Sequence, residues 1–352
     1  IESALLEELA EETVTADSVG EVDCIFLTGL YLAERGIADQ LKRIRTGALP
    51  WPEINADKAL PWIERKTSIK LAASQTEAIR SALRSKITVI TGGPGVGKTT
   101  IVNSILRILA VKRVKLLLCA PTGRAAKRMT EATGMEAKTI HRLLEFDPKT
   151  AGFKCNDENP LDCDLLVIDE TSMVDVLLMQ SLMKAVPTAA ALLIVGDINQ
   201  LPSVGPGQVL ADIIGSDAVP VMRLTEVFRQ AAKSKIITTA HAINAGRMPD
   251  LDKPNGDADF YFISVDDPEQ AVTRIVELVA KRIPRRFGFD PIKDIQVLCP
   301  MNRGGVGARS LNIELQAALN PAGEKKVERF GWIFAPGDKV MQIENDYDKD
   351  VY

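Results

Sequence analysis

The residues best suited to chemistry form a glycine-rich stretch, TVITGGPGVGKTT, at residues 88–100. It has the spacing G-x-x-x-x-G-K-[ST], follows a predicted strand and opens a predicted helix, which a chance glycine-rich turn seldom does. Glycines let backbone N–H groups curl around an anion, and the helix N-terminus adds positive potential. In this pattern Lys98 reaches the β- and γ-phosphates of a nucleotide, and the Thr99 hydroxyl binds Mg²⁺. The expected nucleotide contacts are Gly92, Gly93, Pro94, Gly95, Val96, Gly97, Lys98, Thr99 and Thr100.

Two adjacent carboxylates end a second apolar run, DLLVIDETSM, at residues 164–173. Ligands of open α/β sheets bind at the carboxyl ends of the strands, where Asp169 is expected. Asp169 is predicted to hold Mg²⁺, directly or through water, and Glu170 to orient and deprotonate an attacking water. The alternative is a solvated pair of strand-ending carboxylates, which a neighbouring phosphate-binding loop argues against.

A third apolar run, ALLIV, ends in the polar stretch VGDINQLPSV, residues 195–204. If its strand joins the same sheet, Gln200 can reach a γ-phosphate or its attacking water. Asp197 then senses the metal or holds the neighbouring loop. A third phosphate-reading strand end is typical of ATPases that convert nucleotide state into motion. By itself the stretch is also compatible with a surface turn.

Four short apolar runs must position these groups, and helical stretches separate them. The runs are KITVIT (86–91), VKLLLCA (114–120), DLLVID (164–169) and ALLIVGD (191–197). Continuous apolar strands alternating with helices predict βαβ units and a parallel sheet covered on both faces, which is the α/β class.

The domain organisation follows from changes in pattern along the chain. Residues 1–68 are predicted to be a helical N-terminal segment followed by a proline-rich linker at 48–62. A first α/β domain is expected at 69–216 and a second, incomplete one at 217–352, with strands in VPVMRLTEVF, ADFYFIS and DIQVLCP. The polar residues 147–163 form either a small inserted β-hairpin or a plain surface loop.

Composition narrows the class further. The 352 residues carry a net charge of −4, so nucleic-acid binding requires local basic patches rather than a global basic field. The five cysteines show neither metal-site nor disulfide spacing, which favours reduced thiols and a cytoplasmic location. No apolar run is long enough for a membrane span, and no signal-peptide pattern opens the chain.

Seven ordered motifs resemble those of superfamily 1 DNA helicases, most closely the RecD-like branch that includes the exodeoxyribonuclease V alpha subunit and its stand-alone relatives. They are GGPGVGKTT, APTGRAAKRM, TIHRLL, VIDETSM, VGDINQLPSVGPG, LTEVFRQ and VLCPMNRGGVGARSLN. The resemblance spans about residues 69–352. It implies tandem RecA-like domains. The N-terminal segment resembles the piece that precedes the motor domains in the stand-alone members of the family.

The resemblance also implies roles for residues that the spacing alone does not assign. Gln75 corresponds to the glutamine that reads the adenine edge, and Arg229 to an arginine finger that reaches the γ-phosphate. Phe228 either packs on the base or is an ordinary core residue. Contacts to single-stranded DNA are implied for Thr122, Gly123, Arg124, Lys127, His141, Arg303 and Asn312. For Arg124 and Lys127 an exposed helical face is the alternative, and for His141 a structural role.

The function that the resemblance implies is an ATP- and Mg²⁺-dependent helicase that moves 5′-to-3′ on single-stranded DNA in recombination and repair. Its expected partners are single-stranded DNA, duplex junctions and nuclease or helicase subunits, and the 147–163 insertion lies near the junction. Two alternatives remain: a P-loop ATPase that remodels a protein, and a non-catalytic ATP- and DNA-binding subunit of a nuclease complex. Family members carry further motifs after GDKVMQIENDY, including a second arginine finger, which leaves open whether these residues alone hydrolyse ATP.

Overall fold

The computed structural model describes residues 2–150, 152–226, 234–252 and 258–341, which fall into two compact units. The first unit comprises residues 1–250 and 256–260, and the second comprises residues 251–255 and 261–352. Among the described residues, no helix has the length and apolar character of a membrane span.

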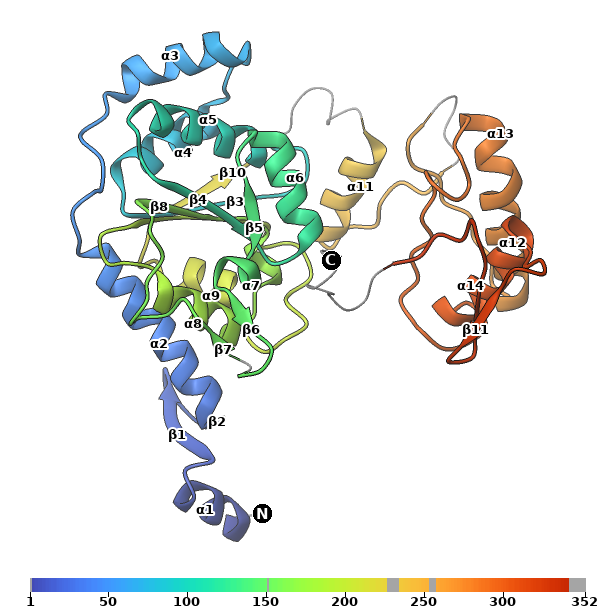
Figure 1. Ribbon diagram of the computed structural model, residues 1–352, viewed down its shortest axis with the longest axis horizontal. Coiled ribbons are helices and arrows are strands. Elements are labelled where there is room, and N and C mark those ends of the chain that lie inside the picture. Colours follow the sequence, from blue (N-terminus) through green and yellow to red (C-terminus); the bar gives the residue numbers. More distant parts are fainter. Residues whose placement is uncertain (1, 151, 227–233, 253–257, 342–352) are drawn as a thin grey trace. The chain divides into compact units, whose positions relative to one another are not determined.

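A parallel sheet forms the centre of the first unit (Figure 1). Each neighbouring pair of strands is parallel, and the order is β10-β3-β9-β8-β4-β5. The strands are β3 (Ile87–Gly92), β4 (Leu116–Ala120), β5 (Ala137–Thr139), β8 (Leu165–Ile168), β9 (Ala191–Gly196) and β10 (Val221–Leu224). The predicted α/β class and its four apolar strands are confirmed.

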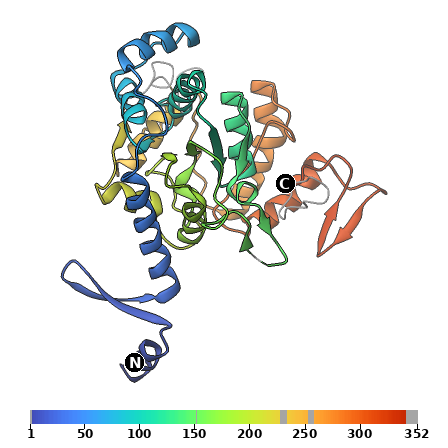
Figure 2. The ribbon, with the colours of Figure 1, turned by 60° about the vertical axis from the view of Figure 1, so that its left-hand side comes forward.

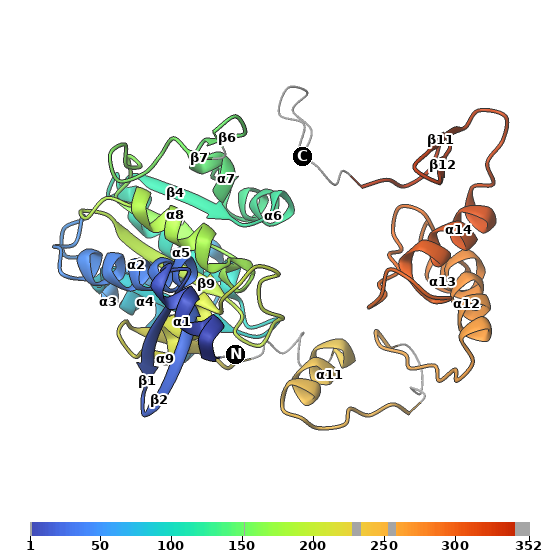
Figure 3. The same ribbon diagram turned by 90° about the horizontal axis from the view of Figure 1, so that it is seen from below.

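Helices cover both faces of this sheet. One face packs on α3 (Ala56–Thr67), α4 (Ala73–Arg84), α5 (Lys98–Val111) and α6 (Gly123–Thr133). The other packs on α2 (Thr28–Arg45), α7 (Ile140–Leu143), α8 (Val176–Ala185) and α9 (Val209–Gly215), with α2 beside α8 (Figure 3). Leu192 and Ile194 of β9 enter one core and Leu193 and Val195 the other, so this strand has to be apolar throughout.

The N-terminal segment is not helical throughout. Between α1 (Glu2–Ala10) and α2, strands β1 (Val14–Val19) and β2 (Val22–Leu27) form an antiparallel hairpin (Figure 2). Gly20 in its turn has a φ of +64°, which glycine adopts without strain. Helices α1 and α2 agree with the predicted helical segment, but the β-branched and aromatic residues between them form strands.

The proline-rich stretch is a packed element rather than a linker. Asn55 caps α3 by accepting a hydrogen bond from the Lys58 N–H, and the helix continues through Pro61. Trp51 is 5% exposed and donates its indole N–H to the Leu83 carbonyl of α4, at 3.1 Å. The tryptophan and isoleucine side chains among the prolines therefore belong to the core that covers one face of the sheet.

The first unit also extends beyond residue 216, where the sequence places a domain boundary. Strand β10, expected in the second domain, pairs with β3 in the first sheet, with Val221 beside Val89 and Leu224 beside Gly92. Helix α11 (Lys235–Asn244) belongs to the same unit. A short apolar run does not reveal which sheet it joins, because pairing is decided by tertiary contacts.

In the described part of the second unit, most of the regular secondary structure is helical. It contains α12 (Pro268–Glu277), the π-helical turn η2 (Leu278–Arg282), α13 (Ile283–Phe287) and α14 (Ala308–Leu319), followed by the hairpin of β11 (Val327–Arg329) and β12 (Trp332–Phe334). The strands predicted in residues 258–264 and 294–300 do not form among the described residues. No described strand runs beside either segment to satisfy its backbone groups.

Candidate functional site

Three polar stretches leave the sheet at the same edge. Strand β9 lies between β3 and β8, with Thr91 beside Gly196 and Ile168 beside Ile194. Because the strands are parallel, the loops that follow them leave from one edge of the sheet. The glycine-rich loop, the Asp169–Glu170 pair and the Gly196–Gln200 stretch are brought together, and the last emerges between the other two.

The glycine-rich loop requires its glycines for packing and for backbone conformation. A Cβ on Gly92 would lie 2.8 Å from both the Leu224 carbonyl oxygen and Val96 Cγ2. Gly95 and Gly97 have φ angles of +76° and +85°. Side chains at these positions would clash or strain the turn.

The loop ends at a helix N-terminus that suits an anion. Gly97 is the N-cap of α5 and offers no side chain to the first-turn N–H groups. The Lys98 ammonium donates to the carbonyl oxygens of Gly92 and Gly93, at 2.5 and 3.1 Å. Thr99 is exposed in the first turn. Free N–H groups, a lysine and a hydroxyl at one helix start have the donor set that a nucleotide phosphate needs.

Gln75 is built into the support of this loop. It is 1% exposed on α4, its amide nitrogen donates to the Val96 carbonyl at 2.9 Å, and its amide oxygen accepts the Ala72 N–H at 3.0 Å. The Gln75 side chain therefore ties the glycine-rich loop to the start of α4. A role in reading adenine stays a prediction.

The two carboxylates after β8 are partly withdrawn from water. The Asp169 N–H donates to the Cys119 carbonyl, and the Glu170 N–H donates to Asp169 Oδ1 at 2.9 Å. Burial raises the pKa of Asp169, although the Glu170 N–H and the Lys98 charge oppose this shift. Burial, and next the Asp169 charge, raises the pKa of Glu170, while Lys98 lowers it. These carboxylates would gain from a cation, because burial penalises their charged form.

The stretch after β9 is held tightly at its start. A Cβ on Gly196 would lie 2.6 Å from Leu210 Cδ2 and 3.3 Å from the Ser172 nitrogen, so only glycine allows this approach. Asp197 is 3% exposed, and its Oδ1 accepts the Asn199 N–H at 3.0 Å. The Thr91 hydroxyl accepts the Ile198 N–H at 3.3 Å and ties the stretch to β3. The Asp197 carboxylate therefore holds the start of its own loop, and a role toward the metal or the neighbouring loop stays a prediction.

The same stretch is anchored again beyond Gln200. The Val176 N–H donates to the Pro206 carbonyl at 3.0 Å, and a Cβ on Gly205 would overlap the Asp175 carboxylate. Asp175 caps α8 through the Leu178 N–H. Gln200 is exposed between the two anchors, and among the described residues its side chain forms no hydrogen bond with Lys98 or Asp169.

The predicted DNA contacts of the first unit have mixed surroundings. Thr122 is the N-cap of α6 and accepts the Ala125 N–H at 3.2 Å, so its hydroxyl has a structural role. Gly123 begins that helix, and Arg124 and Lys127 are exposed on it. Arg128, which the sequence reasoning missed, lies close enough to lower the pKa of Glu170.

His141 sits in an aromatic cluster. Its ring centroid lies 5.8 Å from that of Phe146 and 5.7 Å from that of Phe153, on the short hairpin of β6 (Phe146–Asp147) and β7 (Gly152–Phe153). Burial lowers its pKa, with Asp175 acting in the opposite direction. The insertion thus begins as a hairpin, and residues 154–163 add no strand.

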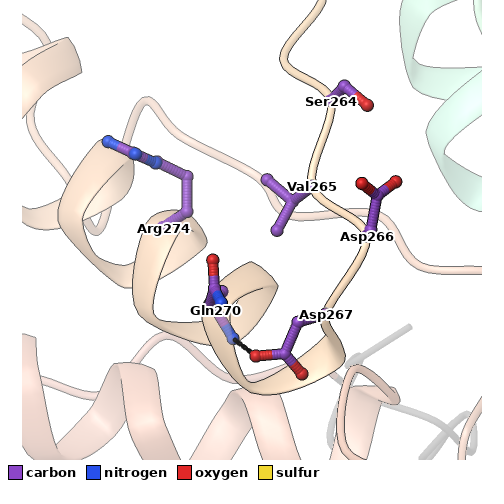
Figure 4. Close-up of a pocket in the computed structure, with 6 residues that line it drawn as sticks. All are labelled: Ser264, Val265, Asp266, Asp267, Gln270 and Arg274. Atoms are coloured by element: carbon purple, nitrogen blue, oxygen red, sulfur yellow. Dashed lines mark hydrogen bonds between the residues drawn. The ribbon is translucent and has the colours of Figure 1, made fainter.

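Other predicted site residues lie elsewhere. Arg303 and Asn312 are exposed in the second unit, in the turn before α14 and on α14 itself. Phe228 and Arg229 fall outside the described residues. A small hollow in the second unit, at the Asp267-capped start of α12, contains none of the predicted site residues (Figure 4). Within the described ranges, no three His, Cys, Asp or Glu side chains could together hold a metal ion.

Comparisons with known proteins identify the family. Residues 75–206 match the AAA domain model, and residues 311–352 match the model of the ATP-dependent RecD-like DNA helicase SH3 domain. The ATP-dependent RecD2 DNA helicase of Deinococcus radiodurans is 36% identical over 328 residues, which cover 93% of this chain. The chain belongs to the RecD-like helicases. The SH3-domain match falls inside residues 217–352, the region for which a second, incomplete RecA-like domain is predicted.

The RecD-like relatives extend well beyond the residues matched here. The chain spans 43% of the Deinococcus radiodurans protein and 63% of the RecBCD enzyme subunit RecD of Mycolicibacterium smegmatis, which is 29% identical. A crystal structure of the Pif1 helicase from Candida albicans overlaps 62% of this chain and 55% of its own, at 22% identity and a TM-score of 0.41.

Proposed function

We propose that this chain is the ATP-binding part of a DNA helicase that moves along single-stranded DNA. The observation that carries the proposal is the position of β9 between β3 and β8, which brings a phosphate loop, a carboxylate pair and the Gln200 loop to one edge. The similarity to the ATP-dependent RecD2 DNA helicase of Deinococcus radiodurans agrees with it.

ATP binds through the start of α5. Its phosphates accept the free N–H groups of the glycine-rich loop, and Lys98 exchanges the Gly92 and Gly93 carbonyls for β- and γ-phosphate oxygens. Gln75 keeps the loop in shape through Val96 and uses its remaining amide hydrogen toward the base. The glycine-rich loop thus needs little rearrangement to accept the nucleotide.

Hydrolysis uses the groups that follow β8. Thr99 and Asp169 would hold Mg²⁺, and the ion neutralises charge on the phosphate oxygens when bound. Glu170 orients the attacking water, and its raised pKa suits a general base better than an ordinary glutamate. Arg229 stabilises the charge that develops on the transferred phosphoryl group.

Coupling to DNA uses the Gln200 loop. Gln200 detects the γ-phosphate, and the anchors at Asp197 and Gly205 transmit its position to β9 and α8. Backbone contacts from Arg124 and Lys127, with Thr122, Gly123 and His141 nearby and Arg303 and Asn312 in the second unit, hold single-stranded DNA without reading sequence. The direction is 5′-to-3′ and the setting is recombination and repair.

Partner subunits are a second element of the proposal. The relatives named RecBCD enzyme subunit RecD work, by their names, in an enzyme of several subunits. A nuclease or helicase partner is therefore proposed for this chain too, beside single-stranded DNA and duplex junctions.

The test measures ATP hydrolysis by the full-length protein with and without single-stranded DNA. We expect strong stimulation by DNA and a loss of roughly 10²-fold or more in Lys98→Ala. Lys112→Ala makes the same change at the exposed far end of α5 and should behave as wild type. DNA-independent turnover would indicate a protein remodeller, and no turnover at all would indicate a non-catalytic subunit. Duplexes with a 5′ or a 3′ tail then determine the direction.

A further inference from the structure

A histidine outside the AAA-domain match lies against the glycine-rich loop. His241 is on α11, and residues 75–206 alone match the AAA domain model. A Cβ placed on Gly93 would lie 2.9 Å from His241 Cε1 and 3.7 Å from each ring nitrogen. The ring edge that carries both nitrogens therefore faces the backbone of the phosphate loop.

Within the described ranges, one of these nitrogens has no hydrogen-bond partner. His241 Nε2 is buried, and it is one of three such side-chain atoms among the described residues, with Thr88 Oγ1 and Ser172 Oγ. A buried polar atom without a hydrogen-bond partner destabilises the conformation that contains it. We therefore expect Nε2 to have a partner in another state of the protein. A ligand seated on the loop is the nearest candidate.

The phosphate end of the nucleotide is the part that His241 can reach. The Lys98 ammonium rests on the carbonyl oxygen of Gly93, the same residue that the imidazole edge faces. The lysine of this motif reaches the β- and γ-phosphates. Gln75, the expected base contact, instead bonds Val96, three residues further along the loop.

Helix α11 is ordered but weakly held to the first unit. Ser234 caps it through the Ile237 N–H, and Lys235 pairs with Asp250 at 3.0 Å. None of its side chains is fully buried. With its apolar side chains half-buried or exposed, α11 has less buried surface to fix its position than the helices that cover the sheet.

We propose that His241 contacts the terminal phosphate of the bound nucleoside triphosphate, with Nε2–H as the donor, and that α11 thereby responds to the presence of the γ-phosphate. The proposal rests on nucleotide binding at the glycine-rich loop, as set out under the proposed function. It assigns a nucleotide-contacting residue to α11.

The test compares binding of a non-hydrolysable ATP analogue and of ADP, each with Mg²⁺ and without DNA, to the full-length protein. In His241→Leu we expect the affinity for the analogue to fall about tenfold and that for ADP to change less than about twofold. His241→Gln places an amide N–H near Nε2 and should retain most of the preference for triphosphate. Asn244→Leu, an exposed position on the same helix, should match wild type.

Equal losses for both nucleotides, or no loss for either, would overturn the proposal, because His241 would then only pack on the loop. A loss in His241→Gln as large as in His241→Leu would do the same. If His241→Leu does not give a cooperative thermal unfolding transition, His241→Phe replaces it as the apolar variant. These results do not depend on the motor function. If His241→Leu selectively loses triphosphate affinity while wild type shows no DNA-stimulated hydrolysis, the proposed role of His241 is supported and the helicase function is contradicted. Wild-type protein that binds neither nucleotide contradicts both.

Discussion

Strand β9 in the first unit and residues 294–300 in the second unit are both predicted to be strands from the sequence. Residues 191–196 form β9, and every one of them is buried between β3 and β8. Residues 294–300, DIQVLCP, contain fewer apolar residues, four of seven, and although they too are predicted as a strand they form none; Leu298 is 88% exposed. A β-branched run thus becomes a strand only where neighbouring backbone is available to pair with it.

The same contrast explains where the candidate site lies. In the first unit, two cores fix the strands and thereby fix the loops that follow them. Among the described residues of the second unit, the fully buried apolar side chains are Val279 and Leu311. A site built from several loops needs strands that are held by a hydrophobic core, as in the first unit.

The largest expected effect is a difference in the free energy of unfolding between a variant in β9 and a variant in residues 294–300. Ile194→Ala removes a side chain that is 0% exposed in β9 and should lower the free energy of unfolding by about 2–5 kcal/mol. Leu298→Ala should change it by no more than about 0.5 kcal/mol, since its side chain has little contact to lose. Chemical denaturation of both variants measures this difference. Equal effects would mean that residues 294–300 are buried as well.

A smaller effect is expected where β9 meets the carboxylate loop. Gly196→Ala forces a methyl group against Leu210 and the Ser172 backbone and should cost about 1–3 kcal/mol, with slower hydrolysis because Asp197 shifts. Gly323→Ala is the matched change in the second unit, where a Cβ meets nothing within 4 Å. An unaffected Gly196→Ala protein would show that this close approach is not required.

A stabilising effect is expected at Asp169. Asp169→Asn removes a buried charge but keeps the oxygen that accepts the Glu170 N–H, so the nucleotide-free fold should gain about 0.5–2 kcal/mol while hydrolysis is lost. Thermal unfolding and a hydrolysis assay check both halves. A less stable variant would contradict the idea that the site holds a destabilising charge.

The smallest effect is a dependence of stability on pH. Folding raises the pKa of Asp169 above 3.8 and that of Glu170 above 4.5. Their contribution to stability is therefore fully present below these ordinary values and is lost as pH rises through the raised ones. Relative to Asp169→Asn/Glu170→Gln, wild type should gain stability as pH falls from 7 towards 4.5. Denaturation series on both proteins measure the difference, and parallel curves would contradict the raised pKa values.

The sequence predicted the parallel sheet and that the loops carrying Lys98, Asp169 and Gln200 leave from one edge of it, because polar groups that follow apolar runs are visible locally. That Gln200 reaches the nucleotide stays a prediction. The sequence did not predict that β10 joins the same sheet or that Trp51 packs on α4, since both depend on distant partners. Gln75 shows the same limit, because its hydrogen bond to the Val96 carbonyl joins residues 21 positions apart, which no short sequence pattern connects. The hydrogen bond between Thr91 and Ile198 was missed for the same reason.

The central claim is that the loop after β9 couples the nucleotide to DNA, and one measurement on Gln200→Ala in the full-length protein tests it most directly. Gln200 is exposed, so the fold and ATP affinity should remain within about twofold of wild type. DNA-stimulated hydrolysis should fall roughly 10²-fold, as when one group that positions the transition state is removed. If ATP affinity collapsed instead and the residual rate were still stimulated by DNA, Gln200 would be a binding residue, and the coupling role of this loop would be wrong.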